Sequence, residues 1–168
     1  WLLGFIIEGH ERFWKIKNNF NDVHRKNWLY SNASHTIDLL RFFGGEIKNC
    51  FINKNSLTEI NGDQFSLSMK FMNNIVGTYI ANWHSPGGWT VKLFGEGITI
   101  KFEPLEKGIW YDKNMNYHKI MPDYVDLNFK PGFYNQMIDF KNLLNTGSLK
   151  WPGQDLENIS KTFSLIKK

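Results

Sequence analysis

An amphipathic stretch that ends in two glycines constrains the fold of this chain more than any other feature. It covers residues 27–46 and reads NWLYSNASHTIDLLRFFGGE. Apolar residues recur at three-residue steps and the stripe is widened by their neighbours, which predicts a helix that buries one broad face. These apolar positions are Ile37, Leu39, Leu40, Phe42 and Phe43. A loop is expected before the helix.

The two ends of this helix carry their own signals. Asn32 or Ser34 can cap its start, because a short polar side chain accepts a hydrogen bond from the first unpaired N–H groups. Gly44 and Gly45 are expected to end it, since glycine tolerates the left-handed conformation that helix C-termini favour. The apolar stripe therefore lies between a polar start and a glycine stop.

Beyond this helix the apolar pattern changes to a period of two. Residues 65–71 alternate apolar with small or polar side chains, which predicts a half-buried strand. Further strands are expected at 2–10, 47–57, 75–83, 89–94 and 98–103, with one or two short ones near 108–111 and 117–121. Helices should start at Pro131-Gly132 and Pro152-Gly153. We therefore predict a single α+β domain over residues 1–168, with a mostly antiparallel open sheet of about six strands. The first helix and the two C-terminal helices should cover one face of the sheet.

Composition and missing motifs exclude several functions. The 20 basic and 16 acidic residues give a net charge of +4 without a basic stripe, which argues against nucleic acid as a partner. No histidine pair or cysteine cluster has metal-ligand spacing, so no metal is expected. The glycines of Gly95-Glu96-Gly97 precede a strand rather than a helix, so this is not a dinucleotide fingerprint.

The cysteine count and the N-terminal segment bear on the compartment. Cys50 is the single cysteine and lies in an apolar run, so we expect an inert thiol in a reducing compartment. The apolar segment WLLGFII is too short to span a bilayer and lacks the flanks of a signal peptide. We therefore expect a cytoplasmic protein with no membrane partner.

His35 is the candidate for chemistry. It lies in the first helical turn, with Asp38 one turn further on and on about the same face. A histidine at this place can accept or donate a proton near neutral pH. The alternative is a histidine of the cap region whose hydrogen bonds are satisfied by Asp38 or by the backbone.

The segment NASHTIDLLRFFGGE resembles the helix that carries the active-site histidine in the C-terminal domain of Gfo/Idh/MocA-family oxidoreductases. The segment NWHSPGGWTVKLFGEGITIKFEPLEKG is similar to the central strands of that domain. FKPGFYNQMIDFKNLL and WPGQDLENISKTFSLI are similar to its last two helices, so the resemblance covers most of the chain. One difference concerns Ser31, which stands where many members carry an Asp partner of the histidine.

The resemblance implies roles for particular residues. His35 would act as general acid or base on a substrate hydroxyl, or would orient it. Asn32 would hydrogen-bond the substrate or hold the His35 ring, while Asp38 would fix the imidazole or the helix. Ser31 is expected beside them at the substrate. The pocket rim is expected to include Glu8, His10 and Trp28, because these residues end the first strand or precede the histidine helix.

The resemblance also implies an enzyme. This chain would be the substrate-binding and oligomerisation domain of an NAD(P)-dependent dehydrogenase. The cofactor would be bound mainly by an upstream Rossmann domain that is absent here, so the chain alone should be inactive. The substrate would be a sugar, nucleotide sugar or cyclitol, in a pathway such as polysaccharide biosynthesis, and a homodimer or tetramer would form through the sheet face. The alternative is a non-catalytic carbohydrate-binding or assembly module of the same fold.

Overall fold

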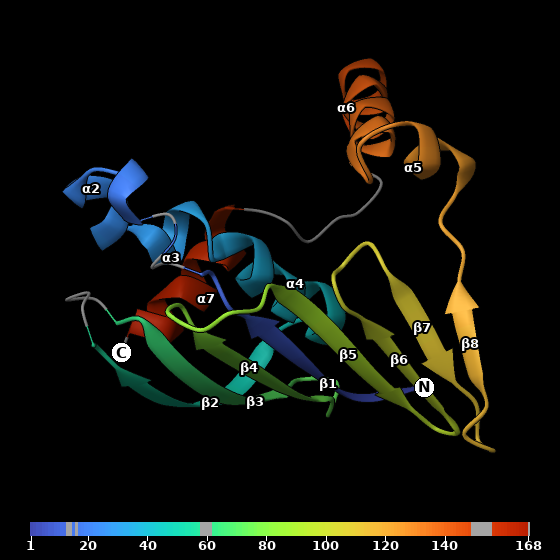
Figure 1. Cartoon of the computed structure of the whole chain (residues 1–168), viewed down its shortest axis with the longest axis horizontal. Coiled ribbons are helices and arrows are strands. Elements are labelled where there is room, and N and C mark those ends of the chain that lie inside the picture. The colour runs from blue at the N-terminus through green and yellow to red at the C-terminus, as the bar shows by residue number, and fades with distance from the viewer. Residues whose placement is uncertain (13–14, 16, 58–61, 149–155, 168) are drawn as a thin grey trace.

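The computed structural model describes residues 1–12, 15, 17–57, 62–148 and 156–167, and its centre is one eight-stranded sheet. The strand order is β2-β3-β4-β1-β5-β6-β7-β8 (Figure 1). The strands are β1 (Leu2–Gly9), β2 (Ile47–Asn55), β3 (Gln64–Phe71), β4 (Val76–Asn82), β5 (Trp89–Gly95), β6 (Ile98–Phe102), β7 (Gly108–Tyr111) and β8 (Tyr117–Ile120). The helices are η1 (Lys17–Asn19), α2 (Asp22–Lys26), α3 (Trp28–Ser31), α4 (Ser34–Gly44), α5 (Tyr124–Asn128), α6 (Phe133–Thr146) and α7 (Leu156–Lys167).

The first strand of the chain lies inside the sheet rather than at its edge. β1 runs parallel to β4 and antiparallel to β5, and the other neighbouring strands pair antiparallel. The predicted α+β class and the mostly antiparallel open sheet are therefore confirmed. The estimate of about six strands was too low, because the short strands expected near 108–111 and 117–121 both form and extend the sheet as β7 and β8.

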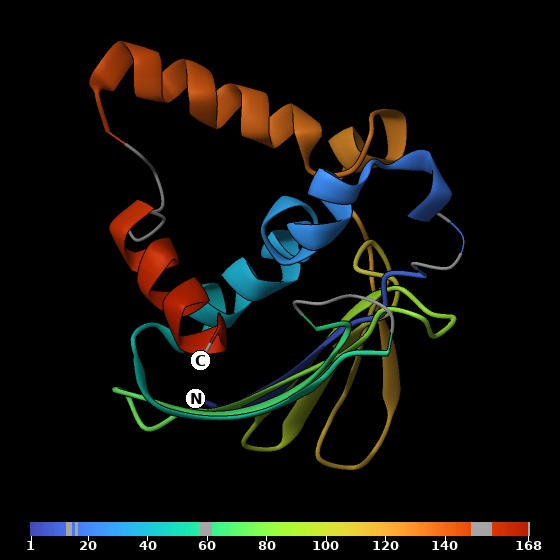
Figure 2. The same cartoon turned by 90° about the vertical axis from the view of Figure 1, so that its left-hand side faces the viewer.

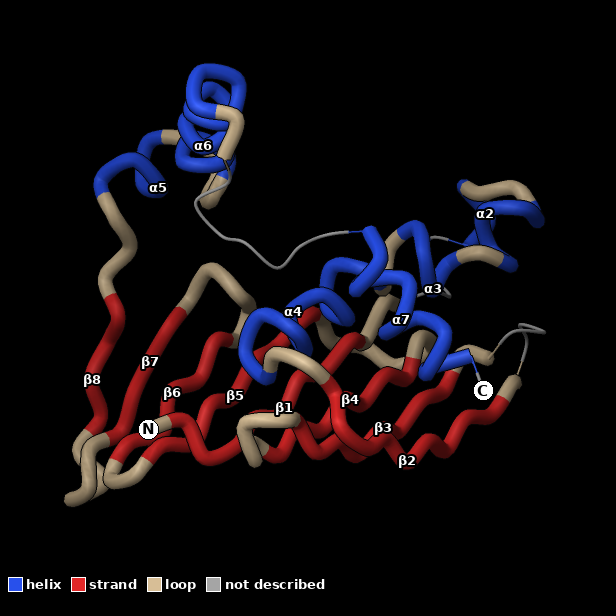
Figure 3. The backbone as a smooth tube through the Cα atoms, turned by 180° about the vertical axis from the view of Figure 1, so that it is seen from behind, coloured by secondary structure: helices blue, strands red, loops and turns tan. Residues whose placement is uncertain are grey.

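Alternation along the strands separates a buried face from an open face. In β3 the buried side chains are Phe65, Leu67, Met69 and Phe71, with exposed Ser66, Ser68 and Lys70 between them. α4 and α7 lie on the buried face, seen from behind in Figure 3. Ile37 and Leu40 of α4 are almost fully buried there, so the helix stripe and the strand alternation meet in one core.

The ends of α4 match the sequence prediction only in part. Gly45 follows the helix with φ 76°, so the glycine stop is confirmed. The predicted side-chain cap was wrong, because Ala33 precedes the first turn and makes no side-chain cap bond. Asn32 instead ends α3, a short helix where a loop was expected. Phe42 is 55% exposed, so the buried stripe is also narrower than predicted.

The last two helices differ in packing. α7 contributes Phe163 and Ile166 to the core, whereas no residue of α6 is buried. Figure 2 shows α6 standing away from the sheet. The prediction that both helices cover the sheet was therefore wrong for α6. The predicted start of the last helix at Pro152-Gly153 lies outside the described residues.

Two smaller expectations can be compared with the structure. Cys50 is half-buried in β2, and burial raises the pKa of its thiol, which reduces its reactivity at neutral pH. Within the described ranges, every helix is too short or too polar to cross a membrane.

Candidate functional site

The candidate site lies at the sheet edge where β1 ends and β5 begins. His35 is exposed in the first turn of α4, and its backbone N–H donates to the carbonyl oxygen of Asn32 at 3.3 Å. The imidazole packs against the indole of Trp89, with ring centroids 5.4 Å apart and ring planes at 43°. One ring face of His35 is therefore set by the first residue of β5.

A buried carboxylate lies beside this ring pair. Glu11 follows β1 by two residues, so it stays on the same face as Ile7 and Gly9, and only 7% of it is exposed. Its Oε1 accepts a 2.9 Å hydrogen bond from Nε1 of Trp89, and its Oε2 accepts one from Nδ2 of Asn32. Three separate segments of the chain are thus joined at one carboxylate.

Burial and hydrogen bonding act on this carboxylate in opposite directions. Removal from water raises the pKa of Glu11, because the charged form loses hydration. The indoles of Trp89 and Trp28, the Asn32 amide and the Arg12 guanidinium each lower that pKa, but burial prevails. Burial also raises the pKa of Tyr79, whose hydroxyl lies 3.3 Å from the hydroxyl of Thr36 beneath the site.

A cavity of about 470 Å³ opens next to Glu11. It is lined by side chains from three regions: His10, Glu11, Arg12 and Lys15 after β1, Asn32, and Gly88 to Trp89 with the Pro104–Glu106 turn. Hydrogen-bonding groups thus surround the cavity, and an aromatic side chain forms part of its wall. A small polyhydroxylated molecule suits such a lining, because polar groups fix its orientation while the ring packs against its carbon skeleton.

His35 itself borders a second, smaller cavity of about 260 Å³ between α4 and α7. Ser34, Asp38 and Arg41 line it from α4, and Thr162 and Phe163 line it from α7. Asp38 therefore lies one turn from His35, as the sequence spacing indicated. The imidazole therefore lines the smaller cavity, and its link to the Glu11 cavity is its contact with Trp89, which lines that cavity.

The structure brings together some of the residues that the sequence analysis selected. His10 lines the larger cavity, and its Nδ1 accepts a 3.3 Å hydrogen bond from the backbone N–H of Asn82. Asn32 lines it too, but its amide nitrogen is bonded to Glu11. These two residues remain candidates for substrate contact together with His35.

The other selected residues lie elsewhere. Trp28 is 3% exposed and belongs to the core, so it supports the site from beneath instead of forming a rim. Ser31 is exposed at the end of α3 and does not line the larger cavity. Glu8 faces the open side of the sheet, where it accepts a 2.7 Å hydrogen bond from Thr90. The structure therefore does not place Glu8 near His35, because strand alternation turns it to the opposite face.

Sequence reasoning missed Glu11 and Trp89. The alternation of β1 carried one signal, because positions 5, 7, 9 and 11 share a face and the last of them is a carboxylate. No signal of comparable strength identified Trp89. Its position depends on the pairing of Gly9 with Trp89 across β1 and β5, which is a long-range register.

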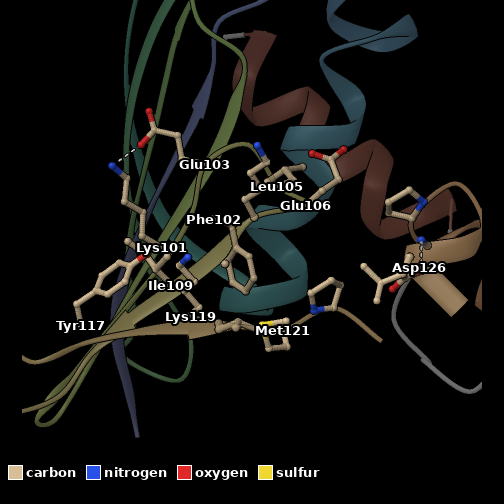
Figure 4. A pocket seen from close by; sticks show the side chains of 17 residues that line it. Lys101, Phe102, Glu103, Leu105, Glu106, Ile109, Tyr117, Lys119, Met121 and Asp126 are labelled. Carbon is tan, nitrogen blue, oxygen red and sulfur yellow. Dashed lines mark hydrogen bonds and ion pairs between the residues drawn. The ribbon is translucent and has the colours of Figure 1, made fainter. Parts of the chain in front are cut away.

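The structure has a third cavity, larger than the other two, at the far end of the sheet. This cavity of about 990 Å³ lies between the outer strands and α5, and Figure 4 shows its lining side chains. Lys101 is paired there with Glu103, and acidic and basic side chains are mixed around it. It meets the site cavity only at Leu105 and Glu106. Glu11, Asn32 and Trp89, the residues linked to His35, do not line it, so size alone does not identify it as the functional site.

The described residues offer little to hold a metal or a dinucleotide. Among the described residues, no group of three or more His, Cys, Asp or Glu side chains could hold a metal ion. Gly95 and Gly97 belong to the hairpin between β5 and β6, as the sequence indicated, and not to a strand–loop–helix unit. That hairpin lacks the helix N-terminus that binds a pyrophosphate.

Comparison with known proteins gives the fold but no sequence match: no protein-family model and no curated protein matches the chain. UDP-N-acetylglucosamine 3-dehydrogenase GnnA from Acidithiobacillus ferrooxidans is 11% identical, with a TM-score of 0.76 over 99% of this chain and 52% of its own. Levoglucosan dehydrogenase, solved with NADH and L-sorbose, is 14% identical, with a TM-score of 0.74 over 96% of this chain and 52% of its own.

A dehydrogenase (MviM) from Clostridium difficile is 15% identical, with a TM-score of 0.73 over 98% of this chain and 52% of its own. This chain thus spans about half the length of these three structures. At such identities the likeness establishes the fold.

Proposed function

We propose that this chain, which has the α+β fold of the C-terminal domain of Gfo/Idh/MocA oxidoreductases, is the substrate-binding half of an NAD(P)-dependent dehydrogenase. The substrate would be the hydroxyl or ketone of a sugar, nucleotide sugar or cyclitol. The observation that carries the proposal is the position of His35, which is exposed and packs against Trp89, a residue that lines the cavity together with Glu11 and Asn32. The similar structures include a nucleotide-sugar dehydrogenase and a levoglucosan dehydrogenase, which supports this substrate class.

His35 would handle the proton in this reaction. During oxidation the imidazole takes the proton of the substrate hydroxyl while the carbon-bound hydrogen leaves as hydride. During reduction the same ring returns the proton to the alkoxide oxygen. A bound nicotinamide supplies the acceptor or donor of that hydride. Trp89 holds the imidazole on one face, and Asn32 and His10 hydrogen-bond substrate hydroxyls from the cavity wall.

The nicotinamide would be bound mainly by a second, nucleotide-binding domain. The similar structures are about twice as long as this chain, and some of them are complexes with NADH or NAD+. In the described part of the chain, no glycine-rich turn leads from a strand into a helix start that could bind a pyrophosphate. The chain alone would therefore bind no NAD(P) and would have no activity.

The open face of the sheet would pair two copies of the chain. It carries small and polar side chains such as Ser66, Ser68 and Thr78, together with apolar ones such as Phe51, which is 74% exposed. Protein interfaces are often only slightly more apolar than ordinary surface, and this composition fits them. Light scattering of the longer protein tests the pairing. A dimer or tetramer should dissociate on Thr78→Glu with Thr99→Glu, and a monomer unaffected by them would refute it.

The competing function is a carbohydrate-binding or assembly module without catalysis. Ser31 favours it, because many members of the resembling family carry an Asp at this position. Ser31 is exposed and does not line the cavity next to Glu11. This weakens the argument, since Ser31 has no part in the arrangement around His35.

The decisive experiment assays the longest protein that contains this chain. Purified protein is incubated with NAD+ or NADP+ and a panel of sugars, nucleotide sugars and cyclitols, and reduced nicotinamide is followed by absorbance. We expect turnover with at least one member of the panel. Sugar binding without turnover, for a protein whose upstream part is not a nucleotide-binding domain, would favour the binding module instead.

A further inference from the structure

Glu11 is a buried titratable group that the proposed proton transfer does not use. Only 7% of it is exposed, and it lines the cavity that Asn32 and Trp89 also line. An ionised carboxylate in such a place is costly unless hydrogen bonds compensate for the lost hydration. The donors on Glu11 come from two other segments, and both segments lead to His35.

The first connection passes through Trp89. Its indole N–H donates to Oε1 of Glu11 at 2.9 Å, and its ring packs against the imidazole of His35. An indole nitrogen is a donor only, so this bond requires an acceptor at position 11. The carboxylate therefore fixes the plane on which His35 rests.

The second connection passes through Asn32. Its Nδ2 donates to Oε2 of Glu11, and its backbone carbonyl oxygen accepts the N–H of His35 at 3.3 Å. Because the amide nitrogen is directed at the carboxylate, Oδ1 is the atom left for a ligand. Asn32 then presents an acceptor to the cavity, which suits a substrate hydroxyl.

We propose that Glu11 is the positioning residue of this site: its carboxylate holds Trp89 against His35 and orients the Asn32 amide so that Oδ1 faces the ligand. The inference rests on the proposed function only for the identity of that ligand. It assigns no proton transfer to Glu11. The bonds from Trp89 and Asn32 are the ones that lead to His35, and they can be measured without turnover.

Other charged and titratable groups surround this carboxylate and contribute to its titration. They are His10, Arg12 and Lys15 after β1, His35 on α4, Tyr79 on β4 and Glu106 in the turn between β6 and β7. Of these, Arg12 lowers the pKa of Glu11 through its charge. The titration of Glu11 must therefore be followed through the signals of the Trp89 indole N–H and the Asn32 side-chain amide, and not through a property of the whole protein.

The first test is a pH titration of the wild-type chain by nuclear magnetic resonance. Because both donors bond to one carboxylate, the Trp89 indole N–H and the Asn32 side-chain amide should shift with a common midpoint. That midpoint should lie above 4.5, the ordinary value for the pKa of Glu, since burial raises the pKa of Glu11. Separate midpoints, or no shift at either group, would overturn the proposal.

The second test is Glu11→Gln, which keeps the shape but offers one acceptor and one NH2 group. The indole can only donate, so the glutamine oxygen should face Trp89 and its NH2 should face Asn32. The side-chain amide of Asn32 should then flip by about 180°, so that its Oδ1 accepts from the glutamine NH2. We expect the chemical shifts of the Asn32 side-chain amide to change, because its N–H group no longer donates to a carboxylate. The chemical shift of the Trp89 indole N–H should change little, because it still donates to an oxygen at position 11.

Two further variants complete the test. Adding Asn32→Asp to Glu11→Gln leaves only oxygen atoms at position 32, so the glutamine NH2 should bond there whichever way that side chain turns, and the Trp89 indole signal should stay as it is in Glu11→Gln. Glu8→Gln is the matched control, because Glu8 is bonded to Thr90 on the opposite sheet face and should leave both reporters unchanged. Asn32 signals that stay unchanged in Glu11→Gln would overturn the proposal. If that variant fails to fold, the wild-type titration decides.

Discussion

The centre of the sheet is tightly packed, whereas the region formed by β7, β8, α5 and α6 is loosely packed. Around β1, β3, β4 and α4 the side chains that face inward are almost fully buried. Beyond β6, the strands β7 and β8 lead to α5 and α6, and neither helix has a buried residue. Apolar side chains on α6 such as Met137 and Leu144 are 62% and 70% exposed.

The difference shows what an amphipathic pattern does and does not determine. Both α4 and α6 carry apolar residues at helical spacing, and both form helices. Only α4 meets a sheet that the same chain provides, because its start is held by Asn32 and its end turns directly into β2. The pattern fixes the apolar face of a helix, but the partner depends on contacts distant in sequence.

The largest expected effect compares one leucine in each region. Leu40→Ala on α4 should lower the free energy of unfolding by about 2–5 kcal/mol, since it removes a fully buried side chain and leaves a cavity. Leu144→Ala on α6 should change it by less than about 0.5 kcal/mol, because that side chain is exposed. Urea unfolding of the two variants measures both values. Equal losses would show that α6 is packed in solution.

Glycine substitutions sharpen the comparison. A Cβ at Gly77 would lie 2.5 Å from Cζ of Phe5 and 2.8 Å from Cε2 of Phe71, both of which are buried. Gly77→Ala should therefore cost about 1–3 kcal/mol of stability through overpacking. A Cβ at Gly108 would lie 2.8 Å from Phe102 and 2.9 Å from Cδ1 of Ile120, in the outer strands.

Gly108→Ala should cost less than Gly77→Ala, because Ile120 is 37% exposed and its end can move aside. Thermal melts of the two variants give the order. A larger loss for Gly108→Ala would mean that the outer strands are as tightly held as the centre.

The smallest expected effect concerns pH, where the two regions should respond with opposite signs. Burial raises the pKa of Glu11, so its contribution to stability is fully present below pH 4.5 and is lost as the pH rises through its folded-state value. Hydrogen bonds from Asn116 and Asn114 lower the pKa of Asp112 in the outer hairpin to about 2. Its contribution is present above pH 3.8 and is lost as the pH falls toward about 2.

Two variants separate these contributions in unfolding curves recorded across the pH range. Glu11→Gln should remove the loss of stability above pH 4.5, and Asp112→Asn should remove the loss between pH 3.8 and about 2. A pH dependence that neither substitution alters would contradict the assignment of these groups.

Much of the fold could be predicted because its signals are local. The strand at 65–71 and the glycine stop at Gly45 follow from alternation and from backbone conformation, and the structure has both. The parallel pairing of β1 with β4 could not be predicted, since it joins segments about seventy residues apart. The solvated face of α6 could not be predicted for a related reason, because periodicity does not specify a partner.

The site was predictable only where chemistry and local structure coincide. His35 stands out by its position in the first turn of α4, and Asn32 by its spacing from it. Glu8 was selected because it ends the first strand, whereas Glu11 lies beyond the predicted end of that strand at residue 10. Trp89 comes near His35 only through the pairing of β1 with β5. Residues that depend on register require a structure to be recognised.

The measurement that tests the proposed function most directly is turnover of the longer protein carrying His35→Ala, recorded together with its melting temperature. A positioned acid–base group typically contributes about 10²–10⁴-fold to rate, so kcat should fall by that factor. The melting temperature should change little, because the His35 side chain is exposed. Unchanged turnover with a collapsed melting temperature would show that His35 is structural and would contradict its catalytic assignment.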